Sequence, residues 1–286
     1  MRITEHVYAK KMTFQAVTPT GVLERTVYVY LVAGDKSSCL IDTGVFPGVN
    51  EVLEFISDSG KKPEDISEIL ITHGHSDHHG ALPSLKRRLQ CTAAASELSA
   101  RWIEDVDLQF RQRPVPHFHD FVEGSAIIER KIRDGNITCL GGSTLVACTA
   151  PGHEPGQTAF FHKEDGVLFA ADCLPVQGEI PVYDDVSAEV GSIRRLAAIP
   201  GVEVLLMSWD DPHIGRGAVQ KAFDDAIEYI RKLHGFTLEG IRQYGEANIE
   251  SVAKYAHQEL GLPQETFTKF FLDTVQAHIR ERDLMI

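Results

Sequence analysis

The sequence predicts a mixed α/β (α+β) fold in which two sheets are covered by helices and followed by a helical tail. Strands and helices alternate in the first third of the chain, short strand-like runs follow over residues 136–171, and only helical patterns occur after Gly217. The 286 residues, 43% of them hydrophobic, can bury a large core. Because no repeat or low-complexity linker interrupts them, we expect one domain over residues 1–216 and a helical extension over residues 217–286 packed on it.

The first sheet is predicted from runs rich in β-branched and aromatic residues, such as TVYVYLVA at residues 26–33. Between Val49 and Ile56, apolar residues recur at the i, i+3, i+4, i+7 spacing of a helix with one buried face, and Gly60 provides a stop. We expect strands at residues 26–33, 38–41, 68–72 and 91–94, and helices at residues 47–59, 81–89 and 97–112.

A second, mainly antiparallel sheet is predicted from short runs punctuated by Gly and Asp. Prolines make residues 113–120, which precede it, a loop. We expect strands at residues 136–140, 144–149, 157–162, 167–171 and 202–207, and helices at residues 188–199, 218–234, 248–260 and 264–282.

Charge and cysteine content narrow the class of protein. With 28 basic and 41 acidic residues the net charge is −13, which repels a phosphate backbone, so we expect no nucleic-acid partner. The five cysteines include no C-x-x-C pair, which favours a reducing compartment over a disulfide framework. The first residues lack the apolar core of a signal peptide, and no apolar run is long enough to span a membrane. We therefore predict a cytoplasmic protein with no membrane partner.

Four potential metal ligands lie within six residues, directly after a predicted buried strand: His73, His75, Asp77 and His78. Imidazole and carboxylate together suit zinc, iron or manganese, and the lack of nearby thiolates argues against a purely structural zinc site. His73 and His75 can face one ion while Asp77 and His78 turn to another. A solvated histidine-rich loop is the alternative, but it fits a bare H-x-H better than this longer run.

Two later turns also place a possible ligand after a predicted strand. Pro and Gly bracket His153 in a rigid loop, and an apolar strand ends in Asp172. Each has a simpler interpretation by itself, as a turn histidine and as a strand-capping aspartate.

Together these motifs resemble the metallo-β-lactamase superfamily, in its glyoxalase/lactonase-like branch. The Asp42-Thr43-Gly44 turn, the run at residues 73–78, the His153 turn and the strand-end Asp172 occur in the order of that family. The resemblance covers roughly residues 5–215. It implies a four-layer αββα sandwich with a two-metal site at one edge of the sheets.

The resemblance also assigns ligands by position. It implies that His73, His75 and His153 hold the first metal. Asp77 and His78 would hold the second, with Asp172 bridging the two.

The last ligand departs from the family pattern. Many relatives carry a Gly-His turn after the strand equivalent to residues 202–207, whereas this chain continues SWDDPH. Direct counting puts Trp209 or Asp210 at the ligand position, and His213 follows later. Either Asp210 replaces the histidine or His213 reaches back across the Pro212 turn. An aspartate would add negative charge and a harder ligand, which favours iron or manganese at the second metal.

The ligand set predicts two divalent metal ions, zinc or alternatively iron or manganese, and a metal-activated hydroxide as the nucleophile. We expect Asp77 to be catalytic, orienting the nucleophile and passing a proton to the leaving group. Asp42 is expected to orient a ligand without binding metal. The predicted activity is metal-dependent hydrolysis of a small ester-like substrate, a thioester or lactone before a phosphodiester. The alternative is a non-haem iron oxidoreductase on the same fold.

Two segments bear on the small-molecule substrate. Residues 114–121 occupy a chain position where superfamily members often build the pocket wall, so we expect His117 and His119 to contact substrate; the alternative is a solvated loop. The tail resembles in layout the C-terminal helices of glyoxalase-type thioesterases. Its apolar spacing, for example at Phe267 and Phe271, fits a core face or the surface of a homodimer.

Overall fold

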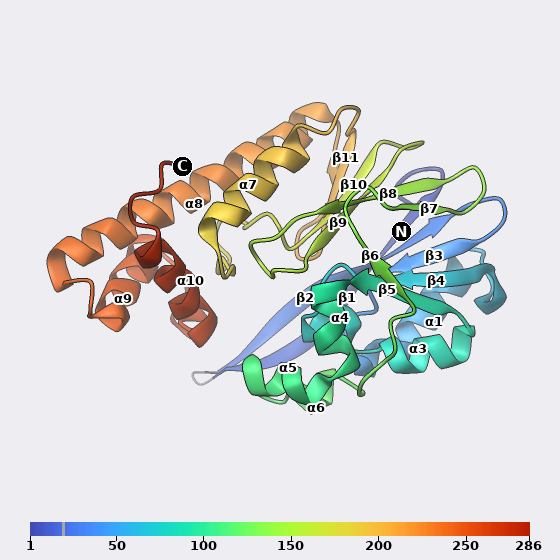
Figure 1. The fold of residues 1–286 in the computed structure, drawn as a ribbon, viewed down its shortest axis with the longest axis horizontal. Helices are drawn as coiled ribbons and strands as arrows, with labels where there is room; N and C mark the ends of the chain where they lie inside the picture. The colour runs from blue at the N-terminus through green and yellow to red at the C-terminus, as the bar shows by residue number, and fades with distance from the viewer. Residues whose placement is uncertain (19–20) are drawn as a thin grey trace.

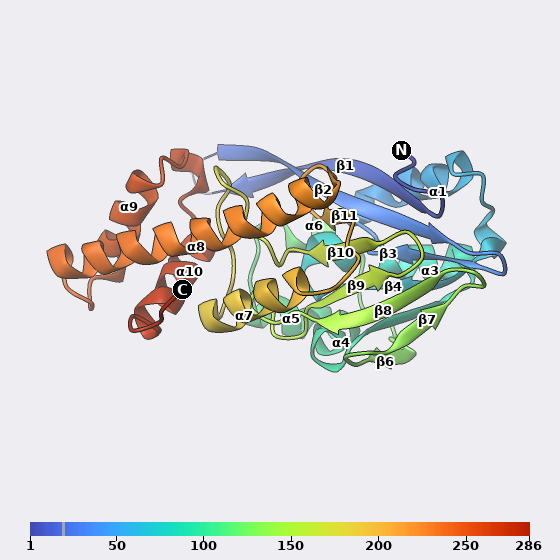
Figure 2. The ribbon, with the colours of Figure 1, turned by 90° about the horizontal axis from the view of Figure 1, so that it is seen from above.

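The computed structural model describes residues 1–18 and 21–286, and these form four layers. Two six-stranded sheets pack face to face, and helices cover the outer face of each (Figures 1 and 2). The predicted αββα sandwich is thereby confirmed. No helix within the described ranges combines the length and apolar character needed to cross a bilayer.

The first sheet has the order β1-β2-β3-β4-β5-β6. Its first three strands are antiparallel, and β3 to β6 are parallel. The carboxyl ends of β3, β4 and β5 therefore meet at one edge of the sheet, where open α/β sheets bind ligands. The strands are β1 (Val7–Thr18), β2 (Gly21–Ala33), β3 (Ser38–Ile41), β4 (Ile66–Leu70), β5 (Thr92–Ser96) and β6 (Arg130–Ile132).

The second sheet has the order β12-β11-β10-β9-β8-β7 and is antiparallel except for the β10–β11 pair. This confirms the mainly antiparallel character predicted for it. Strands β8, β10 and β11 run in the same direction, so their carboxyl ends also share one edge. The strands are β7 (Ile137–Cys139), β8 (Thr144–Thr149), β9 (Thr158–His162), β10 (Val167–Ala171), β11 (Val204–Met207) and β12 (His213–Ile214).

Most helices lie near their predicted positions, but the helix predicted over residues 97–112 is two helices. Asp105 has a non-helical backbone (φ −138°, ψ 84°) and its carboxylate accepts a hydrogen bond from the Leu108 amide, so it ends one helix and caps the next. The helices are α1 (Val49–Asp58), α2 (Ser76–His79), α3 (Leu82–Leu89), α4 (Glu97–Glu104), α5 (Val106–Gln112), α6 (Phe118–Phe121), α7 (Val186–Ala197), α8 (Arg216–Tyr244), α9 (Ile249–Glu259) and α10 (Lys269–Arg280), with single 3-10 turns at Phe46–Gly48, Pro63–Asp65 and Gln264–Thr266.

Apolar side chains fill each space between the layers. Phe160 and Phe169 are buried between the two sheets, and Leu40 is buried under the helices of the first sheet. The largest cluster lies between the second sheet and α7 to α10, where Phe271 of α10 joins Leu205 of β11. The helical extension therefore shares a core with the sandwich. In Figure 2, α8 runs from the second sheet outward to α9 and α10.

Candidate metal centre

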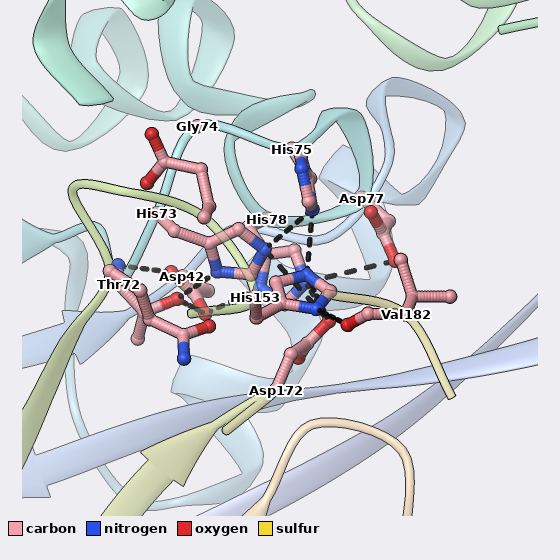
Figure 3. A network of polar contacts seen from close by, with 12 residues as sticks. Asp42, Thr72, His73, Gly74, His75, Asp77, His78, His153, Asp172 and Val182 are labelled. Carbon is pink, nitrogen blue, oxygen red and sulfur yellow. Dashed lines mark hydrogen bonds and ion pairs between the residues drawn. The ribbon is translucent and has the colours of Figure 1, made fainter. Parts of the chain in front are cut away.

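The five candidate ligand side chains from the two sheets converge where the carboxyl ends of their strands meet (Figure 3). His73 and His75 follow β4, and His78 lies in the short helix α2 that begins at once after them. His153 follows β8, and Asp172 directly follows β10. Residues far apart in the chain thus reach one point because strand direction is shared within each sheet.

The first group consists of His73, His75 and His153, all buried. Nδ1 of His75 lies 3.0 Å from Nε2 of His73 and 2.8 Å from Nε2 of His153. The opposite nitrogen of His153 donates to the Val182 carbonyl at 2.5 Å, so its Nε2 carries the lone pair. Nδ1 of His73 meets the Thr72 hydroxyl at 3.1 Å. The ring nitrogens of His73 and His153 that face His75 are thus left for a metal, and Nε2 of His75 is buried without a hydrogen-bond partner.

The second group consists of His73, His78 and Asp172. Oδ2 of Asp172 is 3.4 Å from Nε2 of His78 and 3.3 Å from Nε2 of His153, so this carboxylate lies between the two groups. Oδ2 of Asp77 approaches Nε2 of His78 at 3.7 Å. The resemblance implied a bridging Asp172, and the structure places it where it can bridge.

Asp42 positions the candidate ligands through hydrogen bonds. Its carboxylate accepts from Nδ1 of His78 at 2.8 Å, and from both the amide and the hydroxyl of Thr72 at 2.8 Å. Since the Thr72 hydroxyl hydrogen goes to Asp42, its oxygen is free to accept from His73, which directs Nε2 of His73 into the first group. Asp42 thus orients two of the candidate ligands without joining either group.

The residues fit divalent cations. Among the described residues, Nε2 of His78 and both oxygens of Asp172 are buried and find no hydrogen-bond partner. Such atoms cost about 1–3 kcal/mol each, and more when charged, if nothing satisfies them. Imidazole nitrogens and a carboxylate in this arrangement are the donor set of zinc, iron and manganese.

Burial lowers the pKa of His73 and of His75 well below the ordinary histidine value, and neighbouring positive groups, including Arg113 beside His75, lower it further. Both rings are therefore neutral at physiological pH, which is the form that binds a metal.

The other half of the site is an ion pair. Burial opposes protonation of His78, but Asp172, Asp77 and Asp42 outweigh it and raise the pKa of this ring well above its ordinary value. Burial likewise opposes ionisation of Asp172, but the charges of His78 and His153 bring its pKa to about 2. A cation here would replace the proton on His78.

Two of the four non-glycine residues with a left-handed backbone among the described residues lie at the same edge. Asp42 (φ 62°) and Ala171 (φ 52°), the residue before Asp172, both adopt the left-handed conformation that non-glycine residues avoid. Such conformations persist where the surroundings over-determine them, often at functional sites. Asp42 directly follows β3, and Ala171 is the last residue of β10. At both positions the left-handed backbone turns the chain where a carboxylate faces the site.

Asp210 and His213, the two candidates for the last ligand, belong to neither group among the described residues. Oδ2 of Asp210 pairs with Nε2 of His213 at 3.0 Å, and both side chains are partly exposed. His213 lies in β12 opposite Leu205, two residues back along β11 from the Met207 end beside Asp172. With this pairing His213 contacts Asp210 and neither ligand group, and the choice between the two as last ligand stays a prediction.

A cavity of about 330 Å³ opens beside the ligands, with His75, Asp77 and His153 in its wall. The predicted loop contributes to it through Pro114, Val115, Pro116 and Phe121. His117 and His119 do not line it: His117 pairs with Asp120, and His119 packs against Phe110 and Phe118.

Sequence reasoning missed several residues of this site. Trp209, which was weighed only as a ligand position, lines the cavity, as do residues of β1 and β2 and of the α10 start: Phe14, Ala16, Val17, Leu23, Arg25, Thr268, Lys269 and Phe270. Arg113 was included only as part of a loop. An isolated Arg before Pro114 carries no sequence signal, whereas the alternating apolar residues of β1 could have identified that strand.

Known proteins resemble the chain along most of its length. A hydroxyacylglutathione hydrolase of Methylococcus capsulatus is 26% identical over 89% of this chain and 86% of its own. A protein of Bacillus subtilis, YobT, is 29% identical over 64% of this chain and 74% of its own. The match to a hydroxyacylglutathione hydrolase of Rhodopseudomonas palustris spans only 40% of that relative.

Solved structures share the fold. A metallo-beta-lactamase family protein of Thermus thermophilus superposes with a TM-score of 0.70 at 21% identity, covering 96% of this chain and 94% of its own. A subclass B3 metallo-beta-lactamase of Bradyrhizobium japonicum gives a TM-score of 0.59 at 22% identity over 72% and 86%. The sequence profile of the metallo-beta-lactamase superfamily matches residues 22–246. The match spans both ligand groups and the whole of α8, and the chain belongs to the metallo-beta-lactamase superfamily.

Proposed function

We propose that this protein is a metal-dependent hydrolase of small ester-like substrates, with thioesters and lactones as the preferred class. The observation that carries the proposal is that two adjoining groups of His and Asp ligands, with unpartnered atoms on His78 and Asp172, reach the wall of a cavity through His75 and His153. His73, His75 and His153 would hold one cation, and Asp77 and His78 a second, with Asp172 between them. Cations bound there would lower the pKa of water and polarise the carbonyl that is attacked.

Asp77 is the residue we propose for proton transfer. It lines the cavity and also approaches His78 at 3.7 Å, so its carboxylate lies at the junction between ligands and substrate space. Hydrolysis adds water to the acyl carbon and breaks the C–S or C–O bond. Asp77 would accept the proton that water loses and deliver it to the departing sulfur or oxygen.

The cavity supports a small substrate with an apolar part. Its walls are formed largely by apolar side chains, among them Phe14, Leu23, Val115, Ile180 and Phe270. A cavity of about 330 Å³ suits a small molecule. The net charge of −13 disfavours a polynucleotide. The Methylococcus relative is named for hydrolysis of a thioester, and its match to this chain includes most of the helical extension.

Metal content and a substrate panel test the proposal together. Untagged protein, purified without added metal, is analysed by elemental mass spectrometry and then assayed on thioesters, lactones and phosphodiesters. About two zinc or manganese ions per chain with thioester or lactone turnover would support it. One iron per chain with oxygen consumption would support the oxidoreductase alternative, and absence of metal in every preparation would exclude the mechanism.

A further inference from the structure

Three cations line the cavity, and two of them are engaged by nearby carboxylates. Arg25 pairs with Glu179 at 2.7 Å and stacks over the Trp209 ring at 4.1 Å. Lys269 pairs with Asp273 one helical turn away. The third cation, Arg113, has no comparable partner.

Arg113 is a partly buried arginine whose guanidinium keeps free donors. Only 14% of its side chain is exposed, and the nearest carboxylate oxygen, on Asp184, is 3.6 Å away, beyond hydrogen-bond distance. Throughout residues 1–18 and 21–286, no hydrogen bond from this guanidinium to another residue satisfies the usual geometry. Taking such a charge out of water costs several kcal/mol unless acceptors replace the lost hydration.

The chain holds Arg113 firmly in this position. α5 ends at Gln112, the Arg113 amide bonds to the Gln109 carbonyl at 2.7 Å, and Pro114 prevents the helix from continuing. The guanidinium lies over the ring of Phe270, 4.6 Å from its centroid. Burial lowers the pKa of the Arg113 guanidinium, yet an arginine stays protonated in proteins.

Its position relative to the ligands sets where a bound anion would lie. Arg113 shares the cavity wall with His75, Asp77 and His153, and its charge is felt at both imidazoles. The cavity between them is otherwise mostly apolar. A substrate with its scissile carbonyl at the ligands would therefore direct its other end toward Arg113.

We propose that Arg113 is a specificity-determining residue that binds a carboxylate on the substrate, so that the preferred substrate is an acyl ester or thioester with an apolar body and a terminal carboxylate. This inference rests on the proposed function. The planar fork of a guanidinium matches a carboxylate with two parallel hydrogen bonds. The substrate carboxylate would supply the hydrogen-bond acceptors that the Arg113 guanidinium lacks among the described residues.

The competing explanation is structural. Arg113 lies between α5, Asp184 and Phe270, so it could simply attach the helical extension to the sandwich. In that case its loss would affect all substrates alike. The ratio of the kcat/KM values for two substrates that differ in a terminal carboxylate distinguishes the two explanations.

The test uses the metal-loaded full chain and two N-acetylcysteamine thioesters, glutaryl and hexanoyl, which differ in a terminal carboxylate. We expect the wild type to favour glutaryl in kcat/KM. R113M should lower the glutaryl value about 10- to 100-fold, the loss for a charge-assisted hydrogen bond, and leave the hexanoyl value within about threefold. R113K keeps the positive charge but lacks the planar guanidinium, so its kcat/KM for the glutaryl thioester should lie between the wild-type and R113M values. R111M, a matched charge loss on the exposed face of α5 outside the cavity wall, should leave the ratio unchanged.

Equal losses for both thioesters in R113M would overturn the inference while leaving the hydrolase proposal intact. If the wild type cleaves neither thioester, the hydrolase proposal loses its support, and calorimetric binding of glutarate monomethyl ester still tests Arg113. Binding to the wild type but not to R113M would support the inference, and equal binding to both would overturn it.

Discussion

Two sets of buried histidines among the described residues, at the sheet edge and in the helical extension, differ in what surrounds them. At the sheet edge, ring nitrogens of His73, His75 and His153 face one another beside Asp172, a carboxylate without a hydrogen-bond partner. In the helical extension, the buried imidazoles contact neutral neighbours. There, His278 meets the Tyr183 hydroxyl at 2.7 Å and His234 at 2.9 Å, and His257 meets the Thr266 hydroxyl at 3.0 Å.

The difference shows that burial alone does not make a histidine a ligand. In both clusters burial lowers the pKa of the rings, so neutrality does not separate them. What separates them is the charge of the surroundings: Asp42, Asp77 and Asp172 supply the sheet edge with negative charge that a cation can neutralise. The second cluster offers hydrogen bonds within the core and no group of three ligands among the described residues.

The largest expected contrast is between His75→Ala and His257→Ala. His75→Ala removes a nitrogen of the first group, so metal content should fall and kcat/KM should drop by about 10³-fold or more. His257→Ala should keep the metal content and lose only stability, about 1–3 kcal/mol from a buried site. Elemental analysis and thermal unfolding on the same preparations measure both. Full metal content in His75→Ala would contradict the assignment of the sheet-edge histidines as metal ligands.

Metal removal should lower the stability of the fold only where the ligands at the sheet edge are intact. Because the unfolded chain holds no preformed site, metal at 100 times its Kd should stabilise the fold by about 2.7 kcal/mol. Chelated protein should therefore melt at a lower Tm and recover on reloading. His257→Ala should show the same increment as the wild type, whereas His75→Ala should show a smaller one. Identical Tm values with and without metal in the wild type would contradict a site at the sheet edge.

Asp42→Asn tests the groups that orient the ligands. The side-chain amide of this variant would present a single acceptor oxygen where the carboxylate now serves both His78 and Thr72. We expect metal affinity to fall about 10- to 100-fold while the fold persists. Competition with a coloured chelator measures the affinity. Asp65→Asn, which alters a carboxylate at a distant exposed turn, serves as the control and should not change it.

The acid response of the helical extension tests the second set of histidines. Burial, then His234, lowers the pKa of His278 to about 3, so the unfolded state takes up the proton first. The stability from this neutral ring is complete above about pH 6.5 and falls as pH decreases, by up to tenfold in the unfolding equilibrium per pH unit. In metal-free protein, Tyr183→Phe with His278→Leu should flatten that slope between about pH 6.5 and 4. An unchanged slope would show that other groups control it.

Much of this architecture could be predicted from local signals. The run at residues 73–78 and the strand-end Asp172 follow apolar strands, and shared strand direction brings them together. Strand β1 gives a weaker signal, because Lys10 and Lys11 interrupt the alternation that Met12, Phe14 and Ala16 follow, and pairing with β2 along its whole length stabilises it. The positions of Asp210 and His213 depend on the register in which β12 pairs with β11, and no local sequence pattern specifies that register. Arg113 acquires its environment only through tertiary packing.

The β1–β2 hairpin and the start of α10 both line the cavity, yet they come from opposite ends of the chain. The ligands come from the stretch between them, residues 73–172. The part of the cavity wall formed by these two segments is thus encoded apart from the ligands, whereas Arg113 lies within the ligand-bearing stretch. Evolution, or a mutant library confined to the two ends, can alter which molecule is accepted while the reactive edge is inherited unchanged.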